Sequence, residues 1–162
     1  MDGDYTPNND VDARAVFVGI GSSNTKNDIL RAVLEGAAMS IKSNLKLIEG
    51  LGEKLSEIVI AGGPSKSRIW LQIISDVTGC PISLPEETEG AAFGNAIVAG
   101  VGVGIYKDYA DAVSRIIKVK RNVFIPDKNN NELYNKIYEI YEGLYPKLKD
   151  TYASIAKIRN IL

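Results

Sequence analysis

A short turn rich in glycine and serine holds the residues of this sequence that are best suited to bind a ligand. They are Gly62, Gly63, Ser65, Lys66 and Ser67. An apolar, β-branched run precedes them and a helical pattern follows. Glycines let a ligand approach the backbone closely, and a helix N-terminus offers unpaired N–H groups to anions or polar ligand edges. The turn is thus suited to hold part of a nucleotide, although two glycines after a strand are more often only a turn, and either serine only a helix cap.

The other polar motifs of the sequence are weaker indications of a ligand-binding or metal site. Gly19 and Gly21 with Asn24 imitate a dinucleotide-binding loop, but the third glycine and the acidic residue expected after a second strand are missing. The acidic run at 86–89 has the character of a metal site, yet carboxylates near a helix N-terminus are typical of an exposed loop. Basic residues at 118–121 are typical of solvated surface. We therefore predict no metal ligands in this chain.

The composition excludes several classes of function. There is no histidine among the 162 residues, which excludes a Ser-His-Asp triad, a histidine base and a His-containing zinc site. Cys80 is the only cysteine, so an internal disulfide is excluded and a reducing, cytoplasmic location is expected. The net charge of -1 offers no basic excess to nucleic acid. The weakly polar stretch at 90–106 is too short to span a bilayer, so we expect no membrane partner.

Alternating helices and strands position the turn. Thr25 starts a helix with Asp28 at the capping-box position, and the helix runs to about Leu47 before it stops near Gly50 or Gly52. One face of this helix is apolar and predicts packing against something broad; it consists of Ile29, Ala32, Val33, Gly36, Ala37 and Ile41. The elements that follow are a strand at 57–61, a helix at 67–78 ended by Gly79, a strand at 81–84 and a helix at 89–100. This alternation predicts an α/β fold with parallel strands.

Helical patterns dominate the C-terminal part. We predict a short helix at 108–117, a polar loop at 126–131 and a helix at 132–161 with a break near Pro146. Tyrosines recur at helical spacing in the last helix: Tyr134, Tyr138, Tyr141 and Tyr145. They form either an aromatic binding stripe or a packed helix face with hydroxyls at its rim, and helical periodicity alone favours the packed face. Near the N-terminus, the apolar run at 15–20 is expected to be extended.

The order of these motifs along the whole chain resembles the C-terminal domain of the FGGY family of carbohydrate kinases, and it looks most like the xylulose kinases of that family. The stretch AVFVGIGSSNTKNDILRAVLE (15–35) is similar to the second signature of the family in residue type and spacing. GGPSKSRIWLQIISDVTGCPISLPEETEGAAFGNAIVAGVGVGIY (62–106) is similar to its nucleotide region. The tail YEIYEGLYPKLK (138–149) resembles the C-terminal helices of xylulose kinases.

The resemblance implies a ribonuclease H-like fold of the actin-like ATPase superfamily. Residues 1–107 would form part of the nucleotide-binding domain, and residues 108–162 a helical extension packed on it. The three strands that open the domain in the family have no counterpart here, which implies a truncated chain. We therefore expect an open strand edge and an uncovered apolar face, and a homo-oligomer that covers them.

The resemblance also implies where ATP binds. In such kinases ATP lies between two domains, and the N-terminal domain supplies the sugar pocket, the general-base carboxylate and a phosphate loop. Gly62 and Gly63 would lie against the nucleotide and Ser67 would hydrogen-bond the adenine edge, with Ser65 and Lys66 in the same nucleotide-binding turn. Mg²⁺ would be held mainly by the N-terminal domain, so no catalytic residue is expected in this chain.

The expected reaction of the whole kinase is transfer of the γ-phosphoryl group of ATP to a sugar hydroxyl, with D-xylulose as the expected sugar. This chain alone is expected to be inactive without the N-terminal domain as its partner. Two alternatives remain: a kinase for another sugar or polyol, such as gluconate, ribulose or glycerol, and a non-catalytic interaction or regulatory module with the same fold.

Overall fold

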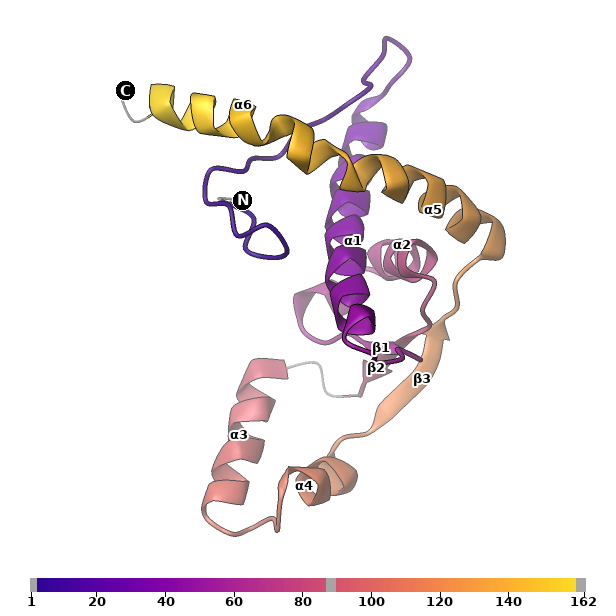
Figure 1. Ribbon diagram of the computed structural model, residues 1–162. Coiled ribbons are helices and arrows are strands. Elements are labelled where there is room, and N and C mark those ends of the chain that lie inside the picture. The colour runs from indigo at the N-terminus through magenta and orange to yellow at the C-terminus, as the bar shows by residue number, and fades with distance from the viewer. Residues whose placement is uncertain (1–2, 87–89, 160–162) are drawn as a thin grey trace. The chain divides into compact units, whose positions relative to one another are not determined.

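The computed structural model describes residues 3–86 and 90–159. The chain folds into two compact units, of which the first comprises residues 1–54 and 128–162 and the second comprises residues 55–127. Figure 1 labels the helices and strands of both units. Compact units of this kind need not coincide with the domains of a family. The division predicted after residue 107 therefore stays a prediction.

The first unit begins with an irregular segment that leads into a long helix. This helix, α1 (Lys26–Gly50), starts at the predicted capping box. The Asp28 N–H donates to the Thr25 hydroxyl at 3.4 Å, and the Thr25 N–H donates to the Asp28 carboxylate at 2.7 Å. Its end at Gly50 also confirms the prediction. Residues 13–21, which include the run expected to be extended, form neither a helix nor a strand.

Two helices complete the first unit, and their bounds correct the prediction. Helix α5 (Lys128–Glu142) begins inside the stretch expected to be a polar loop, and α6 (Leu144–Arg159) follows it directly. The break lies at Gly143, where the N–H donates back to the carbonyl oxygen of Ile140, and not at Pro146. Pro146 lies in the first turn of α6, where a proline costs little because the N–H it lacks would have had no helical partner.

Two buried tyrosines of α5 connect this helix to α1. Tyr134 and Tyr138 are buried, with only 4% and 2% of their surface exposed. The Tyr134 hydroxyl donates to Glu35 of α1 at 2.7 Å, and the Tyr138 hydroxyl donates to Ser43 of α1 at 3.0 Å. These contacts confirm the interpretation of the tyrosine pattern as a packed helix face.

The second unit contains a small mixed sheet. Its elements are β1 (Ile58–Val59), a 3-10 turn η1 (Gly63–Lys66), α2 (Arg68–Thr78), β2 (Ile82–Pro85), α3 (Gly90–Gly102), α4 (Tyr109–Ile116) and β3 (Val119–Phe124). The strand order is β1-β2-β3, and β1 pairs with β2 in parallel, as predicted. Strand β1 is shorter than the predicted 57–61. The first predicted residue of α3, Glu89, lies outside the described residues.

The sequence prediction missed strand β3, which pairs with β2 in the antiparallel direction. Lys118, Lys120 and Arg121 were interpreted as solvated surface, and they do lie at or in this mostly exposed strand. The charged side chains of this exposed edge strand interrupt the alternation of apolar and polar residues that predicts a strand. Only the two ends of the strand carry partly or fully buried apolar residues.

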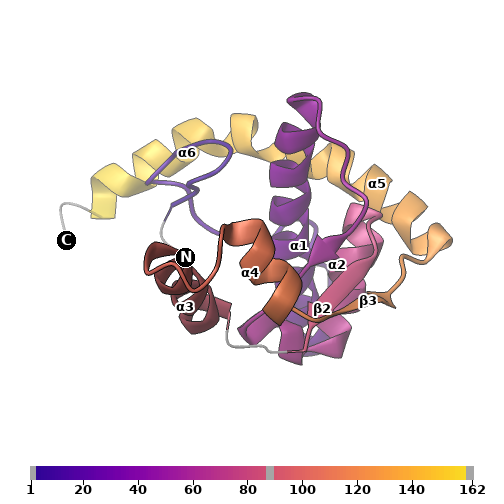
Figure 2. The ribbon, with the colours of Figure 1, turned by 90° about the horizontal axis from the view of Figure 1, so that it is seen from below.

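Helix α2 forms the core of the second unit with β2 and β3 (Figure 2). Leu71, Ile74 and Val77 are at most 1% exposed, and Ile82 of β2 is fully buried. The buried Ser75 hydroxyl donates to the carbonyl oxygen of Cys80 at 2.9 Å. The helix ends at Gly79, as predicted, and Gly79 adopts the left-handed conformation. The turn at residues 62–67 is therefore supported by the well-packed core of the β1–α2–β2 unit.

Candidate functional site

The predicted nucleotide-binding turn connects β1 to α2. The ladder continues past β1, because the Ile60 N–H donates to the carbonyl oxygen of Ser83 at 3.1 Å. Gly62 then has φ 76° and ψ −150°, a conformation that only glycine adopts readily. A Cβ atom built on Gly62 or Gly63 would meet no atom within 4 Å. The backbone of both glycines is therefore open to close approach by a ligand.

The two serines of the turn have different roles. The Ser65 hydroxyl donates to the carbonyl oxygen of Gly62 at 2.7 Å, which commits its proton to holding the turn. The Ser67 hydroxyl is the N-cap of α2 and accepts from the Trp70 N–H at 3.3 Å. Within the described part of the chain, the Ser67 hydroxyl proton has no acceptor of its own. Ser67 can therefore cap the helix and donate to a ligand at the same time.

Further unpaired N–H donors follow Ser67 in the chain, at the start of α2. The Arg68 and Ile69 N–H groups, at the start of α2, have no hydrogen-bond partner among residues 3–86 and 90–159. Lys66 is exposed and forms no ion pair with a described residue. The Arg68 guanidinium lies over the Phe124 ring, 5.2 Å from its centroid, which holds it at β3. The first turn of α2 is therefore a short row of N–H donors suited to polar ligand edges.

A polar network connects the three strands below this turn. The Ser83 hydroxyl of β2 donates to the Glu57 carboxylate at 2.5 Å and accepts from the Asn122 N–H of β3 at 3.0 Å. Arg121 forms an ion pair with the same carboxylate. The hydrogen bond from Ser83 and then the Arg121 guanidinium hold the pKa of Glu57 below its usual 4.5. The network accompanies an irregularity in the β2–β3 register between Ile82 and Leu84.

The turn suits a flat, polar ligand edge better than it suits a metal ion. Two glycines without a neighbouring side chain, a serine donor and a row of unpaired N–H groups match a flat, polar ligand edge. Within residues 3–86 and 90–159, no three carboxylate, thiol or imidazole groups gather as a metal ion requires. Of the acidic run at 86–89, only Glu86 is described, and Glu87, Thr88 and Glu89 lie outside the described residues. The described residues therefore offer no cluster of ligands for Mg²⁺.

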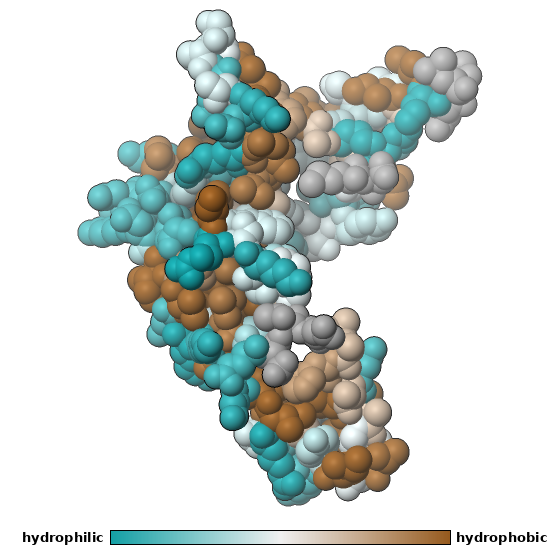
Figure 3. Space-filling model, turned by 180° about the vertical axis from the view of Figure 1, so that it is seen from behind, coloured by the Kyte–Doolittle hydropathy of each residue, from teal (hydrophilic) through white to brown (hydrophobic). Residues whose placement is uncertain are grey.

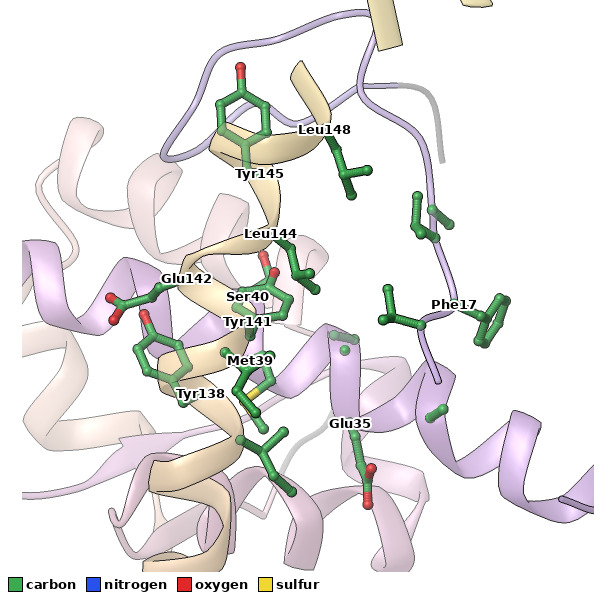
Figure 4. Close-up of a pocket in the computed structure, with 18 of the residues that line it drawn as sticks. Phe17, Glu35, Met39, Ser40, Tyr138, Tyr141, Glu142, Leu144, Tyr145 and Leu148 are labelled. Atoms are coloured by element: carbon green, nitrogen blue, oxygen red, sulfur yellow. The ribbon is translucent and has the colours of Figure 1, made fainter. Parts of the chain in front are cut away.

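The first unit contains an open hollow of about 1180 Å³ that no sequence pattern predicted (Figure 4). Its walls come from the segment at 14–20, from α1 and from α5 and α6. Figure 4 shows Leu144 and Leu148 of α6 on one side and the irregular segment that carries Phe17 on the other. The predicted apolar face of α1 lines this hollow, since Ile29, Ala32, Val33, Gly36 and Ala37 are among its walls. The helical periodicity of apolar residues in α1 was the sequence signal for an apolar face that packs against other segments.

Comparison with known proteins now identifies the family. Residues 1–103 match the FGGY family of carbohydrate kinases, C-terminal domain. The chain belongs to the FGGY family of carbohydrate kinases. It is 36% identical over 158 residues to a xylulose kinase of Staphylococcus epidermidis, an alignment that covers 98% of this chain and 32% of that protein. The chain therefore spans about a third of the length of this relative.

Solved structures confirm the fold of this FGGY chain. The ligand-bound xylulose kinase of Lactobacillus acidophilus superposes with a TM-score of 0.83 at 22% identity, covering 95% of this chain and 31% of that one. The Plasmodium falciparum glycerol kinase with ADP superposes with a TM-score of 0.63 at 26% identity, covering 87% and 29%. The prediction of an actin-like α/β fold of this family is confirmed. None of the described helices is long and apolar enough to cross a membrane.

Proposed function

We propose that this chain is the part of an ATP-dependent carbohydrate kinase that holds the adenosine end of ATP. The observation that carries the proposal is the turn at residues 62–67, where two uncovered glycines meet the N-terminus of α2. The matched region belongs to a family of kinases, and one similar kinase was solved with ADP. The whole enzyme would transfer the γ-phosphoryl group to a sugar hydroxyl in the cytoplasm.

Each residue of the turn has a defined part in this proposal. Gly62 and Gly63 let the adenosine lie directly against the backbone, because a side chain at either position would occupy that space. The Ser67 hydroxyl donates its free proton to the adenine edge while it continues to cap α2. Ser65 holds the turn closed, and the exposed Lys66 adds positive charge near the anionic ligand. When bound, Mg²⁺ would offset phosphate charge, and it would be held mainly by the N-terminal domain.

We propose D-xylulose as the sugar, because the Staphylococcus epidermidis relative is a xylulose kinase and the alignment covers nearly the whole chain. The similar Plasmodium protein is a glycerol kinase, which favours a second candidate in which the acceptor is a polyol. The region shared by both does not distinguish a ketose from a polyol. The sugar pocket and the general base would lie in a separate N-terminal domain, which is the partner that this chain needs for turnover.

A chimeric kinase tests the proposal. This chain replaces the matched 158 residues of the Staphylococcus epidermidis xylulose kinase, and ADP production is measured with D-xylulose and with glycerol. We expect D-xylulose-dependent ADP production by the chimera and none by the 162-residue chain alone. Gly63→Val should raise the KM for ATP by about tenfold or more, because the added side chain blocks the approach of the nucleotide.

Gly63→Val probes the turn because, apart from the chain neighbours, no atom lies within 4 Å of a Cβ built on Gly63, and its φ is not positive. Gly62→Ala is the strained comparison, since Gly62 has φ 76°. A folded chimera whose KM for ATP does not respond to Gly63→Val would overturn the assignment of the turn. A folded chimera that produces no ADP with D-xylulose would overturn the proposal that this chain completes a carbohydrate kinase.

A further inference from the structure

A buried carboxylate of α2, that of Asp76, has no part in the proposed binding of ATP. Asp76 is only 4% exposed. Its Oδ1 atom accepts a hydrogen bond from the Asp127 N–H at 2.9 Å and another from the Gln72 side-chain amide at 2.7 Å. Burying a charged group is costly unless hydrogen bonds replace those it made to water. The bond from Asp127 therefore connects this buried carboxylate to the segment that follows β3.

The segment at 124–127, which continues from β3, lies along one face of α2. The Gln72 amide also donates to the carbonyl oxygen of Ile125 at 2.9 Å. One helical turn earlier, the Arg68 guanidinium lies over the ring of Phe124, 5.2 Å from its centroid. The three side chains of α2 that hold the segment are thus spaced by four residues, which places them on the same side of the helix. These contacts attach α2 to the end of β3.

The turn at residues 62–67 begins on the sheet and ends on α2. Ile60 is still paired with Ser83 of β2, and Ser67 already caps α2. The shape of the turn therefore depends on where α2 lies along the sheet. Apolar surface is abundant in this chain, as the hydrophobic patches in Figure 3 show, but its burial is non-directional and does not fix that position. Hydrogen bonds are directional, so the bonds to the segment at 124–127 do fix it.

We infer that Asp76 is a positioning residue for nucleotide binding, which together with Gln72 fixes α2 along the sheet and thereby places the Ser67 hydroxyl. The inference rests on the proposed binding of ATP at the turn. Asp76 follows Ser67 by nine residues. This is about 14 Å along a helix, so Asp76 is too far to touch a base bound at Ser67 and acts through the helix. Because coupling is reciprocal, a bound nucleotide should in turn hold Asp127 against α2.

Steady-state kinetics of the chimeric kinase test the role of Asp76. Asp76→Ala should raise the KM for ATP by about fivefold or more and leave kcat within about twofold, because it disturbs the binding of the nucleotide and not the sugar pocket or the base. Val77→Ala is the matched control, since Val77 is the next residue of α2 and is fully buried in the apolar core. It should lower the melting temperature at least as far as Asp76→Ala does, yet leave the KM for ATP within about twofold. Equal increases in KM would show general loosening of α2 and contradict the inference.

Hydrogen exchange measures the same coupling from the other end of the helix. With saturating ADP, the Asp127 amide of the chimera should exchange more slowly than without nucleotide, by a factor similar to the KM change of Asp76→Ala. In the Asp76→Ala chimera, ADP should no longer slow this exchange. An Asp127 amide that does not respond to ADP in the unmodified chimera would overturn the inference. Should Asp76→Ala not fold, Gln72→Met replaces it, because methionine keeps the length of the side chain without the amide, and the same change in KM is expected.

The Gly63→Val chimera separates this inference from the proposed function. If Gly63→Val raises the KM for ATP and Asp76→Ala does not, the turn binds ATP and the role assigned to Asp76 is wrong. If Gly63→Val leaves the KM unchanged, the assignment of the turn is wrong and the inference fails with it. An increase in both variants, with the control unchanged, supports both proposals.

Discussion

Glu57 accepts a hydrogen bond at 2.5 Å from the fully buried Ser83 hydroxyl, although the two residues are 26 positions apart. This contact connects the residue before β1 to the middle of β2, and the Asn122 N–H extends it to β3. The strands β1, β2 and β3, which support the turn at residues 62–67, are thus connected through one carboxylate and one hydroxyl. Because the carboxylate must be ionised to be a strong acceptor, the stability of the second unit becomes pH-dependent.

Glu57→Gln should remove part of this pH dependence. The folded pKa of Glu57 lies below its usual 4.5, so its contribution to stability is present above about pH 4.5 and is lost as the pH falls through the folded pKa. We therefore expect the difference in unfolding free energy between the unmodified chain and Glu57→Gln to shrink between about pH 6 and about pH 3. Urea denaturation at several pH values measures it.

Two further variants show which partner lowers the pKa of Glu57. Ser83→Ala should reduce the pH dependence more than Arg121→Gln, because the hydrogen bond from Ser83 is the larger cause. Lys120→Gln is the control, since it removes a neighbouring charge of β3 that is exposed and forms no ion pair with Glu57. An equal response to Lys120→Gln would indicate a general charge effect rather than this contact.

Ser67 should contribute separately to folding and to ATP binding. Ser67→Ala removes the cap of α2 and is expected to lower the unfolding free energy by about 1 kcal/mol. Ser67→Asp keeps a capping oxygen but has no proton to donate at neutral pH, so it should leave stability within a few tenths of a kcal/mol. In the chimeric kinase, both variants should raise the KM for ATP. If Ser67→Asp binds ATP normally, the hydroxyl does not donate to the nucleotide.

Local sequence signals predicted most of the elements. The Thr25–Asp28 capping box and Gly79 each determine a helix end through residues that are close in the sequence. These helix ends can therefore be predicted without knowledge of tertiary contacts. The turn at residues 62–67 is equally local, since it is one continuous segment between a strand and a helix. Its role in binding ATP remains a prediction, because the geometry alone is also that of a well-capped turn.

Contacts between distant segments could not be predicted in this way. Glu57 and Arg121 are 64 positions apart, and neither lies in a pattern that indicates the other. Strand β3 was missed because its middle is charged and exposed. The break at Gly143 was assigned to Pro146 because proline is the stronger sequence signal, although the first turn of a helix accepts it.

Tyr134→Phe should destabilise the first unit at neutral pH by about 1 kcal/mol, because the buried hydroxyl donates to Glu35 and accepts from Arg31. Burial and then Glu35 raise the pKa of Tyr134 above 10.0. Its contribution is therefore complete below about pH 10 and is lost as the pH rises through the folded pKa. The deficit of Tyr134→Phe should accordingly shrink in alkaline urea titrations. Tyr109→Phe, at a position 57% exposed, should change stability by less than about 0.5 kcal/mol.

Two glycines of α3 should respond in opposite directions to the same substitution. Gly94→Ala adds a methyl group where no atom lies within 4 Å, so it should stabilise the helix by about 0.5–1 kcal/mol. A Cβ on Gly100 would lie 2.7 Å from the Tyr106 ring, so Gly100→Ala must displace that ring and should cost about 1–3 kcal/mol. Thermal unfolding of both variants measures the contrast. Adding Tyr106→Ala should remove most of the penalty at Gly100, and a penalty that persists would show that the ring is not its cause.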